Sequence, residues 1–125
     1  MYRQAKVTSL NKALEAVSKL TLSELPLIPG LPDAAESWRR LLALHCELSR
    51  RSTRKNKTYF LSYRDAARAH NGLSQQRAHD ITFAFDRLRM IKIVNKGRAS
   101  PKGGKAAEFR YLLPETENVA EENDE

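Results

Sequence analysis

The sequence has few of the features that mark secreted, membrane or cofactor-binding proteins. It contains one cysteine in 125 residues, which excludes a disulfide within the chain. Lys6, Lys12 and Lys19 interrupt every apolar run near the N-terminus, so we expect neither a secretory signal nor a membrane contact. With 41% hydrophobic and 30% charged residues, the composition is typical of one small globular domain in the cytoplasm.

Residues that would form a catalytic or metal site are also missing. His45, His70 and His79 are predicted on three different helices, and Cys46 adjoins His45, which is poor metal geometry. The Gly103-Gly104-Lys105 run lacks the spacing of a nucleotide-binding loop. We therefore expect no enzyme activity, no cofactor, no metal and no small-molecule substrate.

Charge is present in excess and is unevenly distributed. The chain has 22 basic and 15 acidic residues, a net charge of +7. Residues 33–113 carry 18 basic against 7 acidic side chains, a net +11, whereas residues 114–125 carry six acids and no base. A compact segment of this charge favours a polyanionic partner, and a merely well-solvated basic surface is the alternative.

The first part of the chain, residues 1–32, is predicted to be a helix followed by a Pro-rich linker. Apolar residues recur at helical spacing between residues 9 and 20. Three prolines between residues 21 and 32 then exclude a continuous helix and predict an extended linker that lies along the domain. We interpret residues 1–32 as a packed arm, with a homodimer contact through this arm as the alternative.

Two elements are predicted between residues 33 and 62. Asp33, with Glu36 three residues later, has the spacing of a capping box, and the apolar periodicity that follows predicts a helix to about Ser49. Residues 50–57 are polar and carry five positive charges, so they must face solvent. Residues 58–62 favour a short strand.

Two further helices follow with a tight turn between them. Ser62 and Asp65 have capping-box spacing for a helix over residues 63–70, which Asn71-Gly72 ends. Ser74 then caps a helix of roughly residues 75–90. The side chains predicted to be buried on this helix are those of Ala78, Ile81, Phe85 and Leu88.

The remaining elements are a pair of strands and a tail. Residues 90–94 and 107–113 predict paired strands, and residues 95–105 between them, with three glycines and four basic residues, predict a flexible cationic loop. The acidic tail from Pro114 onward is predicted to be disordered. It either only solubilises the chain or competes with a polyanion for the basic face.

This order of elements resembles the winged helix-turn-helix domain, an α+β, mostly α fold with a three-helix core and a β-hairpin wing. The stretch from Tyr59 to Ser74, together with Leu88–Gly97 and Ala106–Leu112, looks like the C-terminal winged-helix module of primase-polymerase and replication proteins of plasmids, phages and integrated elements. This closer resemblance covers about 55 residues, from Tyr59 to Leu112. It implies a supporting helix at 63–70, a recognition helix at 75–89, a wing at 96–105 and duplex DNA as partner.

Candidate contacts follow from the chemistry of the grooves. Gln and Arg pair with base edges in bidentate fashion, so the predicted base readers are Gln75, Gln76, Arg77 and His79, although a solvated helix start is the alternative. Helix N-termini and cations hold phosphates. The predicted backbone contacts are therefore Ser74, Arg64, Arg68, Lys96, Arg98, Lys102, Lys105, Arg54, Lys55 and Lys57.

The function predicted from these residues is double-stranded DNA binding, in a regulator or in an accessory factor of replication or transfer in a mobile element, associated with the nucleoid. One alternative is a protein-interaction adaptor, because winged helices also serve as packing modules. Another is a binder of RNA or single strands, in which Tyr59, Phe60 and Tyr63 offer stacking surfaces.

Overall fold

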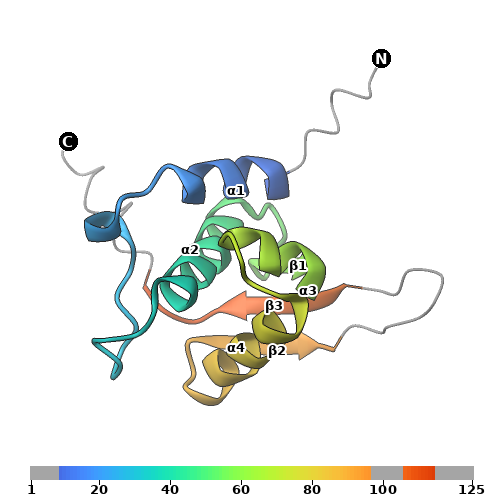
Figure 1. The fold of residues 1–125 in the computed structure, drawn as a ribbon. Coiled ribbons are helices and arrows are strands. Elements are labelled where there is room, and N and C mark those ends of the chain that lie inside the picture. The colour runs from blue at the N-terminus through green and yellow to red at the C-terminus, as the bar shows by residue number, and fades with distance from the viewer. Residues whose placement is uncertain (1–8, 97–105, 115–125) are drawn as a thin grey trace.

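The computed structural model describes residues 9–96 and 106–114, and these form an α+β fold, which confirms the expected class (Figure 1). The predicted base of the wing at Lys96 is described, whereas Arg98, Lys102, Lys105 and the acidic tail lie outside the described residues. The elements in chain order are α1 (Ser9–Ser18), η2 (Leu22–Glu24), α2 (Glu36–Arg51), β1 (Thr58–Leu61), α3 (Tyr63–Ala66), η3 (Ala67–Ala69), α4 (Gln75–Arg87), β2 (Ile91–Asn95) and β3 (Ala107–Tyr111).

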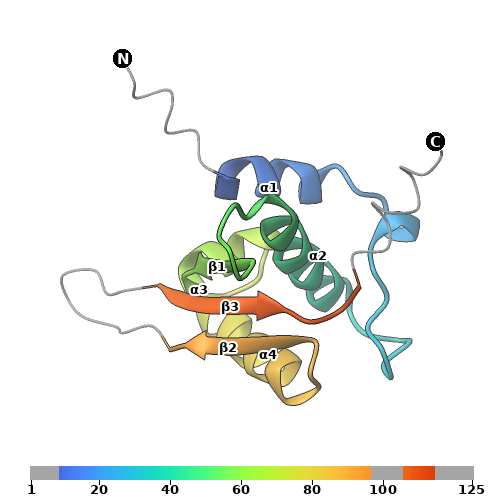
Figure 2. The same cartoon turned by 180° about the vertical axis from the view of Figure 1, so that it is seen from behind.

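The three strands form one antiparallel sheet in the order β1-β3-β2. The predicted pairing of the last two strands is confirmed, although β3 ends at Tyr111, two residues earlier than predicted. β1 pairs with the other edge of β3, with Leu61 opposite Ala107. Figure 2 shows β2 and β3 from the side away from α4. The antiparallel register places the chain between residues 96 and 106 at one end of the sheet and the loop before β1 at the other.

The hydrophobic core lies between the sheet and the helices, around α2. Leu41, Leu42 and Leu44 of α2 are completely buried, as are Phe85 of α4 and Phe109 of β3. One continuous cluster joins these side chains to apolar residues of α1 and of the segment that follows it. Burying large side chains in this way stabilises the fold by about 1.5–3 kcal/mol each.

A histidine is enclosed in this core. His45 of α2 is fully buried, and its ring meets those of Tyr59, Phe85 and Phe109 edge-on. Its Nδ1 lies 2.8 Å from the Tyr59 hydroxyl, whereas its Nε2 has no hydrogen-bond partner among the described residues. Burial lowers the pKa of His45 to about 3, because the charged imidazolium would lose its hydration.

The N-terminal arm packs against the domain, as predicted. Ala13 and Val17 of α1 are buried against α2, and Leu25 and Ile28 are buried from the segment that follows. That segment contains the short 3-10 helix η2, so it is not extended throughout. The apolar stripe of α1 thus finds its partner within the chain, and a homodimer contact through residues 1–32 stays a prediction.

Two neighbouring arginines of α2 hold this arm in place. Arg40 donates from Nη1 to the carbonyl of Val17 (2.8 Å) and from Nη2 to that of Leu20 (3.0 Å), at the C-terminal end of α1. Its Nε donates to Glu36 (2.6 Å), and this hydrogen bond holds the pKa of Glu36 below its usual value. A cation at a helix C-terminus also meets the negative end of the helix dipole. The arm is therefore fixed by charge-assisted hydrogen bonds in addition to apolar packing.

Arg39 holds the segment that follows α1 in the same way. Its guanidinium donates to the carbonyls of Leu22 (2.7 Å), Leu25 (3.0 Å) and Pro26 (3.2 Å). Prolines leave a segment short of backbone donors, so its carbonyls need partners from elsewhere. The side chain of Arg39 supplies them.

The predicted cap at Asp33 is wrong. α2 begins at Glu36, its N-cap is Ala35, and no side chain caps it. The Ala34 N–H donates to the Leu31 carbonyl, which holds the exposed Asp33 in the preceding turn. The acidic Glu36 remains in the first turn of α2, where it favours the helix dipole.

The predicted caps of the next two helices are confirmed. The Ser62 hydroxyl accepts from the Asp65 N–H, and the Ser74 hydroxyl accepts from the Arg77 N–H. Gly72 has φ +89°, the left-handed conformation expected at the turn between them. The predicted helix over residues 63–70 is divided into α3 and η3.

The predicted burial of Leu88 is wrong, because α4 ends just before it. The Met90 N–H donates to the Phe85 carbonyl and the Arg89 N–H to the Asp86 carbonyl, the two bonds of a Schellman motif. This turn leaves Leu88 48% exposed. Arg89 takes the left-handed position, with φ +64°, which costs a non-glycine residue about 1–2 kcal/mol.

Candidate nucleic-acid interface

The first turn of α4 presents most of the predicted base readers to solvent. Gln75, Gln76 and Arg77 are exposed, and Ser74 caps the helix beneath them. Arg77 has no carboxylate within ion-pair distance among residues 9–96 and 106–114. The Ser74 hydroxyl uses its oxygen for the cap, so its proton remains available for a phosphate oxygen.

The other predicted reader, His79, is held in an aromatic cluster. Its half-buried ring stacks on Phe83 at 4.5 Å between centroids and meets the edge of Tyr63 at 4.8 Å. Asp80 accepts a hydrogen bond from Gln76 Nε2 (3.0 Å) and lies 3.4 Å from His79 Nδ1. Gln76 and His79 are therefore oriented by neighbours, whereas Gln75 and Arg77 make no such side-chain contact in the described part of the chain.

The strand β2 is anchored alongside α4. The Asp86 carboxylate of α4 accepts from the Ile93 N–H (3.1 Å), and the tight turn after α4 makes β2 run back along the helix. Burial raises the pKa of the Tyr63 hydroxyl, and the negative charge of the same Asp86 carboxylate raises it further. β2 ends on the side of the start of α4 (Figure 1), and the exposed Lys96 directly follows β2.

The predicted phosphate contacts on α3 and η3 differ in their surroundings. Arg64 is exposed and meets no carboxylate among the described residues. Arg68 is exposed too, but it donates to Asp65 at 3.2 Å. A phosphate would have to compete with Asp65 for Arg68, whereas Arg64 is available directly.

The basic loop before β1 lies away from Lys96. Lys55 and Lys57 are exposed at the end of the sheet opposite the β2–β3 connection, which settles a point that the sequence left open. Arg54 folds back over β1, where its Nε donates to Thr58 Oγ1 (3.0 Å). This cluster therefore does not extend the surface formed by α4 and Lys96.

Many arginines of the basic segment already have partners. Arg39 and Arg40 hold backbone carbonyls of the N-terminal arm. The arginines that meet carboxylates within 4.0 Å are Arg40, Arg50, Arg51, Arg54 and Arg68. The net charge of residues 33–113 therefore overstates the charge that is available to a ligand.

Four further cations were not predicted from the sequence as contacts, and they have no carboxylate partner among the described residues. These are Arg87, Arg89, Lys92 and Arg110. Arg87 lies four residues after Phe83 and eleven after Gln76, so helical spacing places it on their face of α4 and could have identified it. Lys92 and Arg110 come together only through the register of β2 and β3, which the sequence does not specify.

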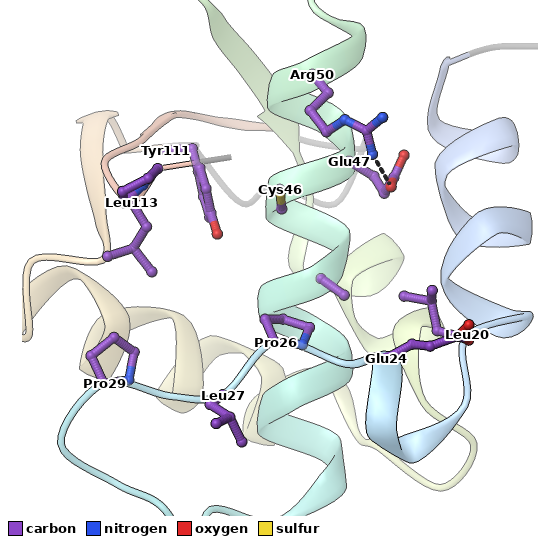
Figure 3. A pocket seen from close by; sticks show the side chains of 12 residues that line it. Leu20, Glu24, Pro26, Leu27, Pro29, Cys46, Glu47, Arg50, Tyr111 and Leu113 are labelled. Atoms are coloured by element: carbon purple, nitrogen blue, oxygen red, sulfur yellow. Dashed lines mark hydrogen bonds and ion pairs between the residues drawn. The ribbon is translucent and has the colours of Figure 1, made fainter. Parts of the chain in front are cut away.

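A hollow of about 680 Å³ lies between the Pro-rich segment, α2 and the chain after β3 (Figure 3). Its lining is mostly apolar and includes Leu27 and Leu113. Glu47 at its side is paired with Arg50 at 2.7 Å.

Residues 9–96 and 106–114 contain no group of three His, Cys, Asp or Glu side chains that could hold a metal ion.

Within the described ranges, every helix is too short or too polar to cross a membrane. Comparison of the chain with protein-family models, curated proteins and solved structures gave no match.

Proposed function

We propose that this protein is a winged-helix protein that binds double-stranded DNA, with α4 in the major groove. The observation that carries the proposal is the start of α4, where two exposed glutamines and an exposed arginine follow the serine that caps the helix. A helix that enters the major groove presents these first turns to base edges. Arg77 recognises guanine and Gln75 recognises adenine, each through paired hydrogen bonds.

The surrounding cations support the same orientation. The exposed Ser74, Arg64 and Lys96 contact the phosphates, and Arg68 joins them once a phosphate displaces Asp65. Arg98, Lys102 and Lys105 extend this contact along the connection between β2 and β3. Gln76 and His79 act with Asp80 as an oriented set, and Phe83 offers its apolar edge to a thymine methyl group.

The wider role is a regulator, or an accessory factor of replication or transfer in a mobile element. The sheet order β1-β3-β2 with α4 directly before β2 supports the winged-helix assignment. A protein-interaction adaptor is the less favoured reading, because the exposed cations without carboxylate partners would then repel one another with nothing to offset them.

Arg77→Ala tests the base-reading role. After a binding-site selection with the unaltered protein, the variant should lose about 1–3 kcal/mol at the selected site and tolerate base changes there. The matched control is Arg64→Ala, which removes the same exposed charge from α3 and should weaken selected and unrelated duplexes equally. Equal effects of Arg77→Ala on both duplexes would show that α4 does not read bases.

A further inference from the structure

The sheet has a second face, turned away from α4, that carries a row of positive charge. The register places Thr58, Arg110 and Lys92 side by side across β1, β3 and β2. Neighbouring strands lie about 4.8 Å apart, so this row is short and dense. Figure 2 shows β2 and β3 on this side of the molecule.

The row contains two like charges, Lys92 and Arg110, and neither has a carboxylate within 4.0 Å among the described residues. Lys92 and Arg110 are direct cross-strand partners, an arrangement that destabilises a sheet. Arg54 supplies a third cation over β1, since its Nε donates to Thr58 Oγ1. The carboxylate nearest to these cations, Glu108, lies 3.7 Å from Arg54 and is itself 15% exposed. An anion that spans the three strands would relieve this repulsion.

Two positions with a strained backbone lie at the end of the sheet where β1 and β2 begin and β3 ends. The two non-glycine residues with positive φ in the described chain are Lys57 and Arg89, and both are exposed cations. Lys57 directly precedes Thr58, and Arg89 lies two residues before Ile91, the partner of Tyr111. Strained residues persist where the surrounding structure or a function holds them. Both residues therefore lie beside the ends of the two edge strands, close to the row along the chain.

An exposed aromatic ring adjoins the row. Phe60 of β1 is 48% exposed, and the Arg54 guanidinium carbon lies 4.9 Å from the centre of its ring. Phe60 is the cross-strand partner of Glu108, so it stands on the same face of the sheet as the cations. Arg54 is thereby fixed by three contacts, to Thr58, to Glu108 and to Phe60.

We propose that this face, made of Arg54, Phe60, Lys92 and Arg110, is a binding site for single-stranded nucleic acid. The cations hold the phosphate backbone, and Phe60 with Arg54 stacks against a base. A track of positive charge beside an aromatic platform is what single strands need, because the phosphates follow the cations and a base stacks on the ring. This site is separate from the one proposed at α4, and each can fail without the other.

The test is a titration of a fluorescent oligothymidylate of about 12 nucleotides onto the full chain and its variants. Phe60→Leu keeps an apolar side chain but removes the π-face, and should weaken binding about 5- to 150-fold. The double change Lys92→Gln and Arg110→Gln should flatten the salt slope by about 1.4. The matched control, Lys12→Gln on α1 with Lys19→Gln just after it, removes the same charge elsewhere and should change the affinity less than about 3-fold.

The outcomes separate the two sites. Single-strand affinity that falls with the sheet variants and not with Arg77→Ala supports the proposal. If Phe60→Leu and the double variant bind the oligonucleotide as the α1 control does, while their melting temperatures match that of the unaltered protein, the sheet site does not exist. Loss of duplex binding by Arg77→Ala alone tests α4 independently of this result.

Discussion

Acidification from pH 6.5 to pH 4 should destabilise the protein by about 3 kcal/mol through His45 alone. The buried imidazole has a pKa of about 3 in the folded state against about 6.5 in the unfolded chain. Above pH 6.5 both states are neutral at this residue, so it contributes no pH dependence. Below pH 6.5 the His45 side chain binds a proton in the unfolded chain but not in the folded chain. The free energy of unfolding therefore falls by about 1.4 kcal/mol per pH unit.

His45→Gln isolates this effect, because glutamine cannot titrate. Urea unfolding at several pH values should show that the unaltered protein loses about 3 kcal/mol more than the variant between pH 6.5 and pH 4. His70→Gln, the same change at a half-buried position outside the core, is the matched control for the substitution itself. Parallel profiles for His45→Gln and the unaltered protein would mean that His45 accepts a proton without unfolding.

Arg40→Ala should reduce the free energy of unfolding by about 2–4 kcal/mol. The change removes two hydrogen bonds to the α1 carbonyls and the pair with Glu36, and each charged hydrogen bond contributes about 1.5–3 kcal/mol. The expected loss is smaller than the sum of the three bonds, because the two carbonyls and Glu36 regain hydrogen bonds to water when Arg40 is removed. The side chain of Arg40 is only 14% exposed, so solvent screens these contacts weakly.

Arg50→Ala on the same helix provides the comparison in urea unfolding. Arg50 pairs with Glu47 near the surface, at 34% exposure, and such pairs contribute about 0–1 kcal/mol. Arg40→Lys should recover only part of the loss, because an ammonium cannot reproduce the forked geometry. An Arg40→Ala variant no less stable than Arg50→Ala would contradict the role of Arg40 in holding the arm.

The sequence predicted the elements where the pattern was local. Hydrophobic periodicity located α1, α2 and α4, and alternation located β2 and β3. The caps at Ser62 and Ser74 were predictable because each bonds to a backbone N–H three residues away. The burial of Leu88 was predicted wrongly because the Schellman motif that ends α4 has an arginine at its left-handed position. A glycine there would have indicated the end of the helix in the sequence.

The distribution of charge could not be predicted from composition. Arg39 and Arg40 counted toward a basic surface, yet their acceptors are carbonyls 13 to 23 residues earlier in the chain, which only the packed arm brings near. Lys92 and Arg110 are separated by a long loop in sequence and become neighbours through strand register. The helix face of Gln75 and Arg77 was predictable, because exposure there follows from the periodicity of α4 alone.

The measurement that tests duplex binding most directly is a titration of the unaltered protein onto double-stranded DNA at salt concentrations from about 50 to 200 mM. The structure predicts that the logarithm of the association constant falls linearly with the logarithm of salt concentration. The slope should correspond to about four or more phosphates, near −3.6 or steeper, because each neutralised phosphate contributes about −0.9. Binding that is absent at the lowest salt concentration, or that does not change with salt, would contradict the proposal that this protein binds DNA.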